Sequence, residues 1–140
     1  MYILTVEESF ASAHQLRGYQ GKCENLHGHT WRVAASVSGR ILNEIGLLID
    51  FHDLKDMLRG IVKELDHANL NAIPPFDSVN PSSENLARYI AERLSEEITR
   101  LQGPGNALES VTVWESESSR CTYVLPRKSE QERPVQADSL

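Results

Sequence analysis

The sequence lacks the long apolar runs and the basic leader that direct a protein into or across a membrane. No stretch approaches the roughly 18 consecutive apolar residues of a membrane-spanning helix, so we expect no membrane insertion. Residues 1–14 carry acids where a secretory signal would carry basic residues and a long apolar run, so we expect no export. The expected location is therefore the cytoplasm.

An excess of positive charge is also lacking. The 140 residues include 14 lysines and arginines against 20 aspartates and glutamates, which gives a formal net charge of −6. Binding to nucleic acid or to an anionic membrane requires a basic surface, so neither partner is expected. A small anionic substrate is still compatible with this charge, because a few cationic side chains around a pocket would suffice.

Cysteine is scarce as well, since the chain has only Cys23 and Cys121. Cytoplasmic thiols are normally reduced, so we expect both to be free rather than paired in a disulfide. The apolar and charged fractions, 40% and 24%, are ordinary for a globular protein. The length fits one domain with a hydrophobic core of its own.

Hydrophobic periodicity predicts six elements in the order strand, strand, helix, helix, strand, strand. Their expected ranges are 2–10, 30–38, about 52–65, 82–101, 109–115 and 120–125. Asp50 is the expected N-cap of the first helix, and Ser82 or Ser83 that of the second. This order predicts an α+β fold in which a four-stranded antiparallel sheet carries two helices on one face.

The expected domain covers residues 1–126. Residues 127–140 are polar and lack periodicity, so we expect a flexible C-terminal tail there. A four-stranded sheet has two open edges, and proteins normally pair or protect such edges. We therefore expect a homo-oligomer whose subunits pair through their sheet edges.

Three of the five histidines have a spacing that suits a metal ion. His27 and His29 lie two residues apart at the start of an expected strand, so both imidazoles project to the same face. His14 follows the first expected strand, which the short connection makes a neighbour of the second. Three imidazoles leave the fourth position of a tetrahedral zinc ion open, as in catalytic sites. The alternative is a turn with two surface histidines and a packed His14.

Cys23 lies in a polar loop, four residues before His27. A thiol near a metal ion or an imidazolium has a lowered pKa, and its thiolate can act as a base near neutral pH. The alternative, a buried and inert cysteine, is the commoner fate of a single cysteine. That alternative suits Cys121 better, because Cys121 alternates with Tyr123 and Leu125 on one face of an expected strand.

Two acidic residues are further candidates. Asp66 precedes His67 at the end of the first expected helix, where a carboxylate can orient an imidazole for proton transfer. The dipeptide alone favours the plainer alternative, a histidine stabilised by the helix dipole. Glu115 shares a strand face with apolar residues, so it requires a partner. A flat heterocycle with an amino group beside a ring N–H would provide one; a solvated strand end is the alternative.

Five separated motifs together resemble the 6-pyruvoyltetrahydropterin synthase family, and most closely its bacterial branch, which makes 6-carboxytetrahydropterin in the queuosine pathway. The motifs are FASAH at 10–14, CENLHGH at 23–29, LDHANLN at 65–71, NPSSENL at 80–86 and VWE at 113–115. They occur in order along residues 1–126. The serines at 82 and 83 replace threonines of the family pattern and keep the hydroxyl groups.

The resemblance implies a T-fold subunit that assembles through sheet edges into a barrel, usually as a homohexamer with active sites at subunit interfaces. It also implies a role for each candidate residue: zinc ligands His14, His27 and His29, catalytic base Cys23, proton relay Asp66 and His67, and pterin contacts Glu115, Ser82 and Ser83.

The implied reaction converts 7,8-dihydroneopterin triphosphate to 6-carboxy-5,6,7,8-tetrahydropterin and releases acetaldehyde and triphosphate. One alternative is the sister activity, 6-pyruvoyltetrahydropterin synthase, which uses the same zinc and cysteine without carbon–carbon cleavage. Another is a non-catalytic zinc- or pterin-binding assembly protein, which would not require a base and a proton relay. A third is an aldolase variant of the fold, in which a carboxylate often replaces the cysteine as base.

Overall fold

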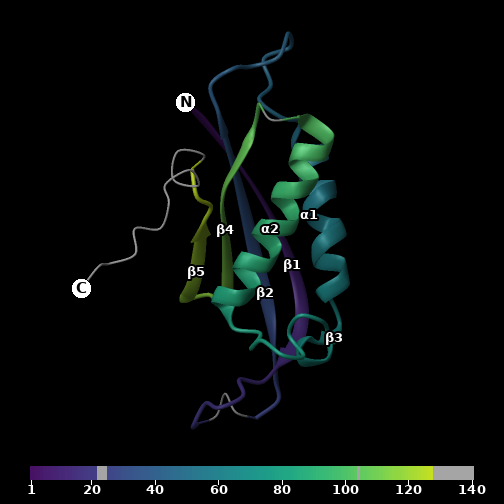
Figure 1. Ribbon diagram of the computed structural model, residues 1–140, viewed down its shortest axis with the longest axis vertical. Helices are drawn as coiled ribbons and strands as arrows, with labels where there is room; N and C mark the ends of the chain where they lie inside the picture. The colour runs from purple at the N-terminus through teal and green to yellow at the C-terminus, as the bar shows by residue number, and fades with distance from the viewer. Residues whose placement is uncertain (22–24, 104, 128–140) are drawn as a thin grey trace, which may run out of the picture.

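A computed structural model describes residues 1–21, 25–103 and 105–127 (Figure 1). The strands are β1 (Tyr2–His14), β2 (His27–Gly39), β3 (Ala68–Asn69), β4 (Ala107–Ser116) and β5 (Ser119–Val124). The helices are α1 (Phe51–Leu65), the short 3₁₀ helix η2 (Leu70–Ala72) and α2 (Ser83–Gln102). None of the described helices is long and apolar enough to span a membrane.

The strands form one sheet in the order β3-β1-β2-β4-β5. The four long strands pair antiparallel, as the sequence predicts. The prediction of four strands was wrong by one, because β3 pairs parallel with the end of β1 and aligns Ala68 with Ser12. A strand of two residues is too short to have a hydrophobic period, so only the folded chain reveals it.

β1 and β2 extend farther toward their connecting loop than the alternation of apolar residues predicts. β1 continues to His14 and β2 begins at His27, and the register aligns these two residues directly. The same register aligns Ser12 with His29. The pairing of β1 with β2 therefore brings three histidines to one end of the sheet.

Both helices begin where their caps predict. The Asp50 carboxylate accepts the N–H of His52 at 2.7 Å, and the Ser82 hydroxyl accepts the N–H of Asn85 at 3.2 Å. Such caps satisfy backbone donors that have no partner inside the helix. Each helix turns an apolar stripe toward the sheet, and both lie on the same side of it (Figure 1). The α+β fold with two helices on one face is confirmed.

The hydrophobic core lies between the helices and the sheet. Side chains alternate along each strand, so every second residue points into this layer. On β2 these are Trp31, Val33, Ala35 and Val37, all fully buried, and His27 and His29 continue the same face. On the opposite face of the sheet, the outer face, no helix of the described residues is packed. Its central strands carry mostly hydroxyl side chains, with Thr5 bonded to Ser36 and Thr112 to Thr122.

Candidate functional site

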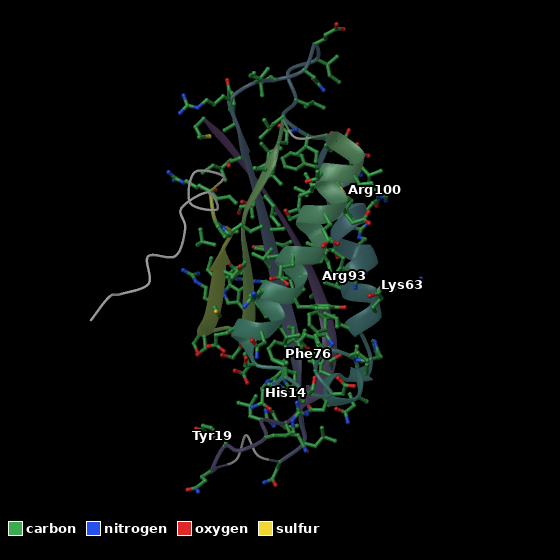
Figure 2. All side chains as sticks on the ribbon, viewed as in Figure 1. His14, Tyr19, Lys63, Phe76, Arg93 and Arg100 are labelled. Carbon is green, nitrogen blue, oxygen red and sulfur yellow. The ribbon has the colours of Figure 1, made fainter. Side chains whose placement is uncertain are left out.

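Three histidines and one glutamate meet at the end of the sheet. One ligand atom from each of His14, His27, His29 and Glu115 lies within 4.8 Å of the others. The residues come from β1, β2 and β4, which are neighbours in the sheet. Figure 2 shows His14 below Phe76, near the end where β3 lies. Strand pairing thus brings together residues as far apart in the sequence as His14 and Glu115.

Backbone carbonyl groups fix the orientation of two of these imidazoles. His14 Nδ1 lies 2.7 Å from the Pro81 carbonyl oxygen, and His27 Nδ1 lies 2.7 Å from that of Asn25. A carbonyl oxygen only accepts, so each Nδ1 carries the proton, and each Nε2 presents a lone pair. Those two Nε2 atoms face each other at 3.1 Å. This tautomer and orientation are the ones that metal-binding histidines adopt.

His29 completes the donor set. Its Nε2 lies 2.9 Å from Glu115 Oε1 but is not aligned for a hydrogen bond, so it is a buried polar atom without a hydrogen-bond partner among the described residues. Burial lowers the pKa of His29, and the neighbouring His14 and His27 lower it further, while Glu115 acts in the opposite direction. A lowered pKa keeps the imidazole neutral near pH 7, which is the form that binds metal ions.

The donor set fits zinc. Two nitrogens bound at about 2.0–2.1 Å to a tetrahedral ion lie roughly 3.3 Å apart, close to the observed separation of the His14 and His27 Nε2 atoms. Imidazole nitrogens and carboxylate oxygens are among the usual ligands of that ion. The group could hold zinc with three histidines and an open fourth position, or with Glu115 in that position.

Glu115 lies on the sheet face that alternation predicts, and it has partners there, as a carboxylate on that face requires. It is neither fully solvated nor isolated on an apolar face, since Oε1 lies 2.9 Å from His29 and 3.5 Å from His14. A register shift between Trp114 and Ser116 accompanies this placement. Alternation had placed Glu115 on the face of the sheet that His29 also occupies. The contact between Glu115 and His29 could not be predicted, because it depends on the pairing of β2 with β4, which sequence spacing does not reveal.

Asp66 and His67 lie just after α1. Asp66 is the C-cap of the helix, and His67 has a positive φ of 51°, so the chain turns sharply between helix and β3. His67 Nδ1 lies 2.9 Å from Asp66 Oδ2, and Oδ1 accepts the Ala11 N–H at 2.9 Å. The Ala11 bond and then His67 lower the pKa of Asp66. The two side chains contact each other, as a relay requires, but neither belongs to the histidine group.

The remaining predicted residues take different places. Ser82 caps α2, and Ser83 is the first residue of that helix and is half-buried. The preceding Pro81 carbonyl contacts His14, so the start of α2 lies against the candidate metal site. Cys23 lies outside the described residues. Cys121 is free and partly buried, and burial raises the pKa of its thiol.

Two asparagines that the sequence analysis did not assign hold the chain that leaves His14. Asn71 accepts the Gln15 N–H at 2.8 Å and donates to the Gln15 carbonyl at 2.9 Å. Asn80 makes the same pair of bonds with Arg17, both at 2.9 Å. Each amide group thus pairs with the backbone as a neighbouring strand would. Their presence in the motifs LDHANLN and NPSSENL was the only feature of the sequence that pointed to a role for them.

The chain is similar to several known proteins. The family model described as 6-pyruvoyl tetrahydropterin synthase matches residues 3–126. A 6-carboxy-5,6,7,8-tetrahydropterin synthase from Synechocystis is 40% identical, covering 92% of this chain and 98% of that protein. A dihydroneopterin monophosphate aldolase from Pyrococcus furiosus is 39% identical, covering 76% and 83%. The structure of 6-pyruvoyl tetrahydropterin synthase from Caenorhabditis elegans superposes with a TM-score of 0.76 at 28% identity, covering 90% and 98%.

Proposed function

Because the chain belongs to the 6-pyruvoyl tetrahydropterin synthase family, we propose that it converts 7,8-dihydroneopterin triphosphate to 6-carboxy-5,6,7,8-tetrahydropterin, with release of acetaldehyde and triphosphate. The enzyme is then a lyase that acts in the cytoplasm in queuosine and 7-deazaguanine synthesis. The observation that carries the proposal is the convergence of three imidazoles with a carboxylate at one end of the sheet. The Synechocystis relative, similar over most of both chains, supports the carboxy product.

Zinc is the proposed cofactor, held by His14, His27 and His29. A bound zinc ion supplies Lewis-acid chemistry toward oxygens of the substrate side chain. The protein supplies its orientation, since the Pro81 and Asn25 carbonyls keep the Nε2 atoms of His14 and His27 facing the centre. The buried Nε2 of His29, which has no hydrogen-bond partner among the described residues, supports a cation at this position.

The other candidate residues divide the remaining work. Cys23, as a thiolate, removes a proton from the substrate side chain. Asp66 holds His67 by its Nδ1, which leaves Nε2 to exchange a proton with the substrate. Glu115 accepts hydrogen bonds from the amino group and the ring N–H of the pterin, once its carboxylate turns away from His29. Ser82 and Ser83, at the start of α2 beside His14, provide hydroxyls to the same ring.

The proposed assembly is a homohexamer of T-fold subunits that join through their sheet edges into barrels, with active sites at subunit interfaces. β5 is one edge of the sheet, and β3 covers only the end of β1 on the other side, so both edges offer backbone groups to a neighbour. His67 is 82% exposed, so a neighbouring subunit can approach it. This arrangement would let Asp66 and His67 act on substrate held by an adjacent chain.

Product analysis tests the reaction. Zinc-loaded protein is incubated with 7,8-dihydroneopterin triphosphate, and the pterin and any released aldehyde are identified together, with Cys23→Ala as the matched control. We expect 6-carboxytetrahydropterin with acetaldehyde, and neither product from the Cys23→Ala protein at full zinc content. A 6-pyruvoyl product without acetaldehyde would show that the protein has the sister activity. No turnover would favour the interpretation as a non-catalytic zinc- or pterin-binding assembly protein.

The Pyrococcus furiosus relative makes an aldolase the second candidate. A dihydroneopterin aldolase would cleave the same side chain by a retro-aldol step, and with a phosphorylated substrate the two-carbon aldehyde would keep its phosphate. Incubation with 7,8-dihydroneopterin monophosphate separates the two activities. A phosphorylated two-carbon aldehyde from the monophosphate, with no 6-carboxy product from the triphosphate, would replace the proposed reaction.

A further inference from the structure

The outer face of the sheet carries a row of side chains that the proposed reaction does not use. The registers align Ser9 with Arg32, Arg32 with Trp114, and Trp114 with Arg120. Four neighbouring strands thus place two guanidinium groups on either side of one indole. This row is on the outer face, where Thr5, Ser36, Thr112 and Thr122 also lie. Glu7, two residues before Ser9, is an exposed acid on the same face.

Stacking fixes the first of these guanidinium groups. The Arg32 Cζ lies 3.9 Å from the centre of the Trp114 ring, and the Arg120 Cζ lies 5.7 Å from it. Stacking uses the flat face of a guanidinium and leaves its N–H donors free in the plane. Within the described part of the chain, no carboxylate forms an ion pair with Arg32 or Arg120.

A hollow of about 440 Å³ opens beside this stack. Its lining residues are Ser9, Thr30, Arg32, Trp114, Ser116 and Glu117. Three of them offer hydroxyl groups, which can donate to the same oxygens that a guanidinium binds in its plane. Only Glu117 is negatively charged, and it is an exposed residue of the turn between β4 and β5.

We propose that this hollow binds a phosphate-class oxyanion, with Arg32 as the principal ligand and the hydroxyls of Ser9, Thr30 and Ser116 as further donors. The N–H donors of a guanidinium match the paired oxygens of a phosphate group. Arg120 adds positive charge from the far side of the indole. Glu117 weakens the binding of an anion, because its carboxylate repels one.

The site is separate from the histidine group. Thr30 follows His29 and Ser116 follows Glu115 in the sequence, and adjacent strand residues point to opposite faces of a sheet. The hollow therefore lies behind the candidate metal site, across the sheet. The proposal does not rest on the proposed reaction, and the two can fail independently.

The two tryptophans allow each face to be observed by itself. Trp114 belongs to the hollow, whereas Trp31 is buried on the helix side, with its ring 4.9 Å from that of His14 and 5.2 Å from that of His29. The experiment is titration of the ¹⁵N-labelled full chain with inorganic phosphate, and separately with triphosphate, at constant ionic strength. The indole N–H resonances are followed by NMR. We expect a saturable shift of the Trp114 resonance with little change at Trp31.

Three variants give the test its direction. Arg32→Gln should weaken binding roughly tenfold or more, because a hydrogen bond to a charged group contributes about 1.5–3 kcal/mol. Arg100→Gln is the matched control: it removes the same charge from the exposed end of α2 (Figure 2) and should leave the affinity unchanged. Glu117→Gln should tighten binding, and it keeps the proposal testable if Arg32→Gln disturbs the fold.

The outcomes separate clearly. If triphosphate binds more tightly than inorganic phosphate, the ligand is a chain of phosphates. If the two bind equally, the ligand is a single phosphate group. Either result supports the site. A shift confined to Trp31 would place the anion at the histidines and overturn the proposal. Equal losses of affinity in Arg32→Gln and Arg100→Gln would also overturn the proposal, because Arg32 would then have no specific role. Weaker binding in Glu117→Gln would overturn it as well, because an anion in the hollow would be repelled by the Glu117 carboxylate.

Discussion

The Nε2 atoms of His14 and His27 lie 3.1 Å apart, although each ring already uses its Nδ1 proton on a backbone carbonyl. Two lone pairs at that distance repel each other unless a cation lies between them. His29 adds a third nitrogen that is buried without a hydrogen-bond partner among the described residues. At the scale of single residues, the histidine group therefore has the arrangement of a candidate cation site.

Removal of one imidazole tests this arrangement. His27→Ala should lower zinc content to near zero, since two remaining histidines bind the ion far more weakly than three. The control is His52→Ala, which removes an exposed histidine at the start of α1 and should keep zinc at the wild-type level. Zinc is measured by atomic emission on purified protein. Full zinc retention in His27→Ala would contradict the three-histidine assignment.

The charge of Asp66 should affect the stability of the folded chain. The Ala11 N–H, and after it His67, lower the pKa of Asp66 in the folded chain. A carboxylate whose folded pKa is depressed adds stability above its unfolded pKa, about 3.9, and loses that contribution as pH falls through the folded value. Wild type should therefore be more stable than Asp66→Asn at pH 7, and the difference should shrink below about pH 4.

The measurement is the free energy of unfolding by urea at several pH values from 7 down to 3. Asp77→Asn serves as the control, because Asp77 is an exposed loop residue without a hydrogen bond or ion pair to the described residues. It should differ from wild type equally at every pH. A constant gap between wild type and Asp66→Asn over the whole range would show that hydrogen-bond geometry, not charge, sets the role of Asp66.

At the scale of elements, the site depends on segments that are not helix or strand. The chain beyond β1 is held by Asn71 and Asn80, each with two hydrogen bonds to one backbone residue. Asn80 also lies next to Pro81, whose carbonyl orients His14. One loop therefore connects the start of α2, a candidate metal ligand and the segment that leads to Cys23.

Asn80→Ala should lower the free energy of unfolding by about 1–2 kcal/mol, since it removes two side-chain hydrogen bonds in a half-buried position. Asn80→Asp keeps the acceptor for the Arg17 N–H but loses the donor to the Arg17 carbonyl. The stability of this variant should therefore lie between those of wild type and Asn80→Ala. Asp77→Ala, in the same loop, should stay within about 0.5 kcal/mol of wild type. An Asn80→Ala protein as stable as wild type would show that the two bonds add nothing over water.

At the scale of the whole molecule, the sequence was most informative where a period could be counted. The four long strands, both main helices and the caps Asp50 and Ser82 follow from alternation, from the 3.6-residue stripe and from side chains that accept backbone N–H groups. The two-residue β3 has no period. The contact of Glu115 with His29 depends on which strands become neighbours, and pairing across many residues leaves no local signal.

The proposed assembly depends on the open edges of the sheet, so its test concerns the whole molecule. Leu125 donates its N–H to the Glu109 carbonyl on β4, and the direction of N–H groups alternates along a strand, so the Thr122 N–H faces the open edge of β5. Thr122→Pro removes that donor and should prevent a neighbouring strand from pairing there. We expect the variant to elute as a smaller species than wild type in size-exclusion chromatography with light scattering.

The control for this prediction is Thr122→Val. Both substitutions lose the hydroxyl bond to Thr112, but only proline loses the backbone donor. The valine protein should therefore keep the wild-type assembly. Both variants should keep the far-ultraviolet circular dichroism of the folded subunit, because the Thr122 N–H has no partner among the described residues. Identical masses for the proline and wild-type proteins would show that subunits do not join through β5, and the barrel expected from edge pairing would then require a different contact.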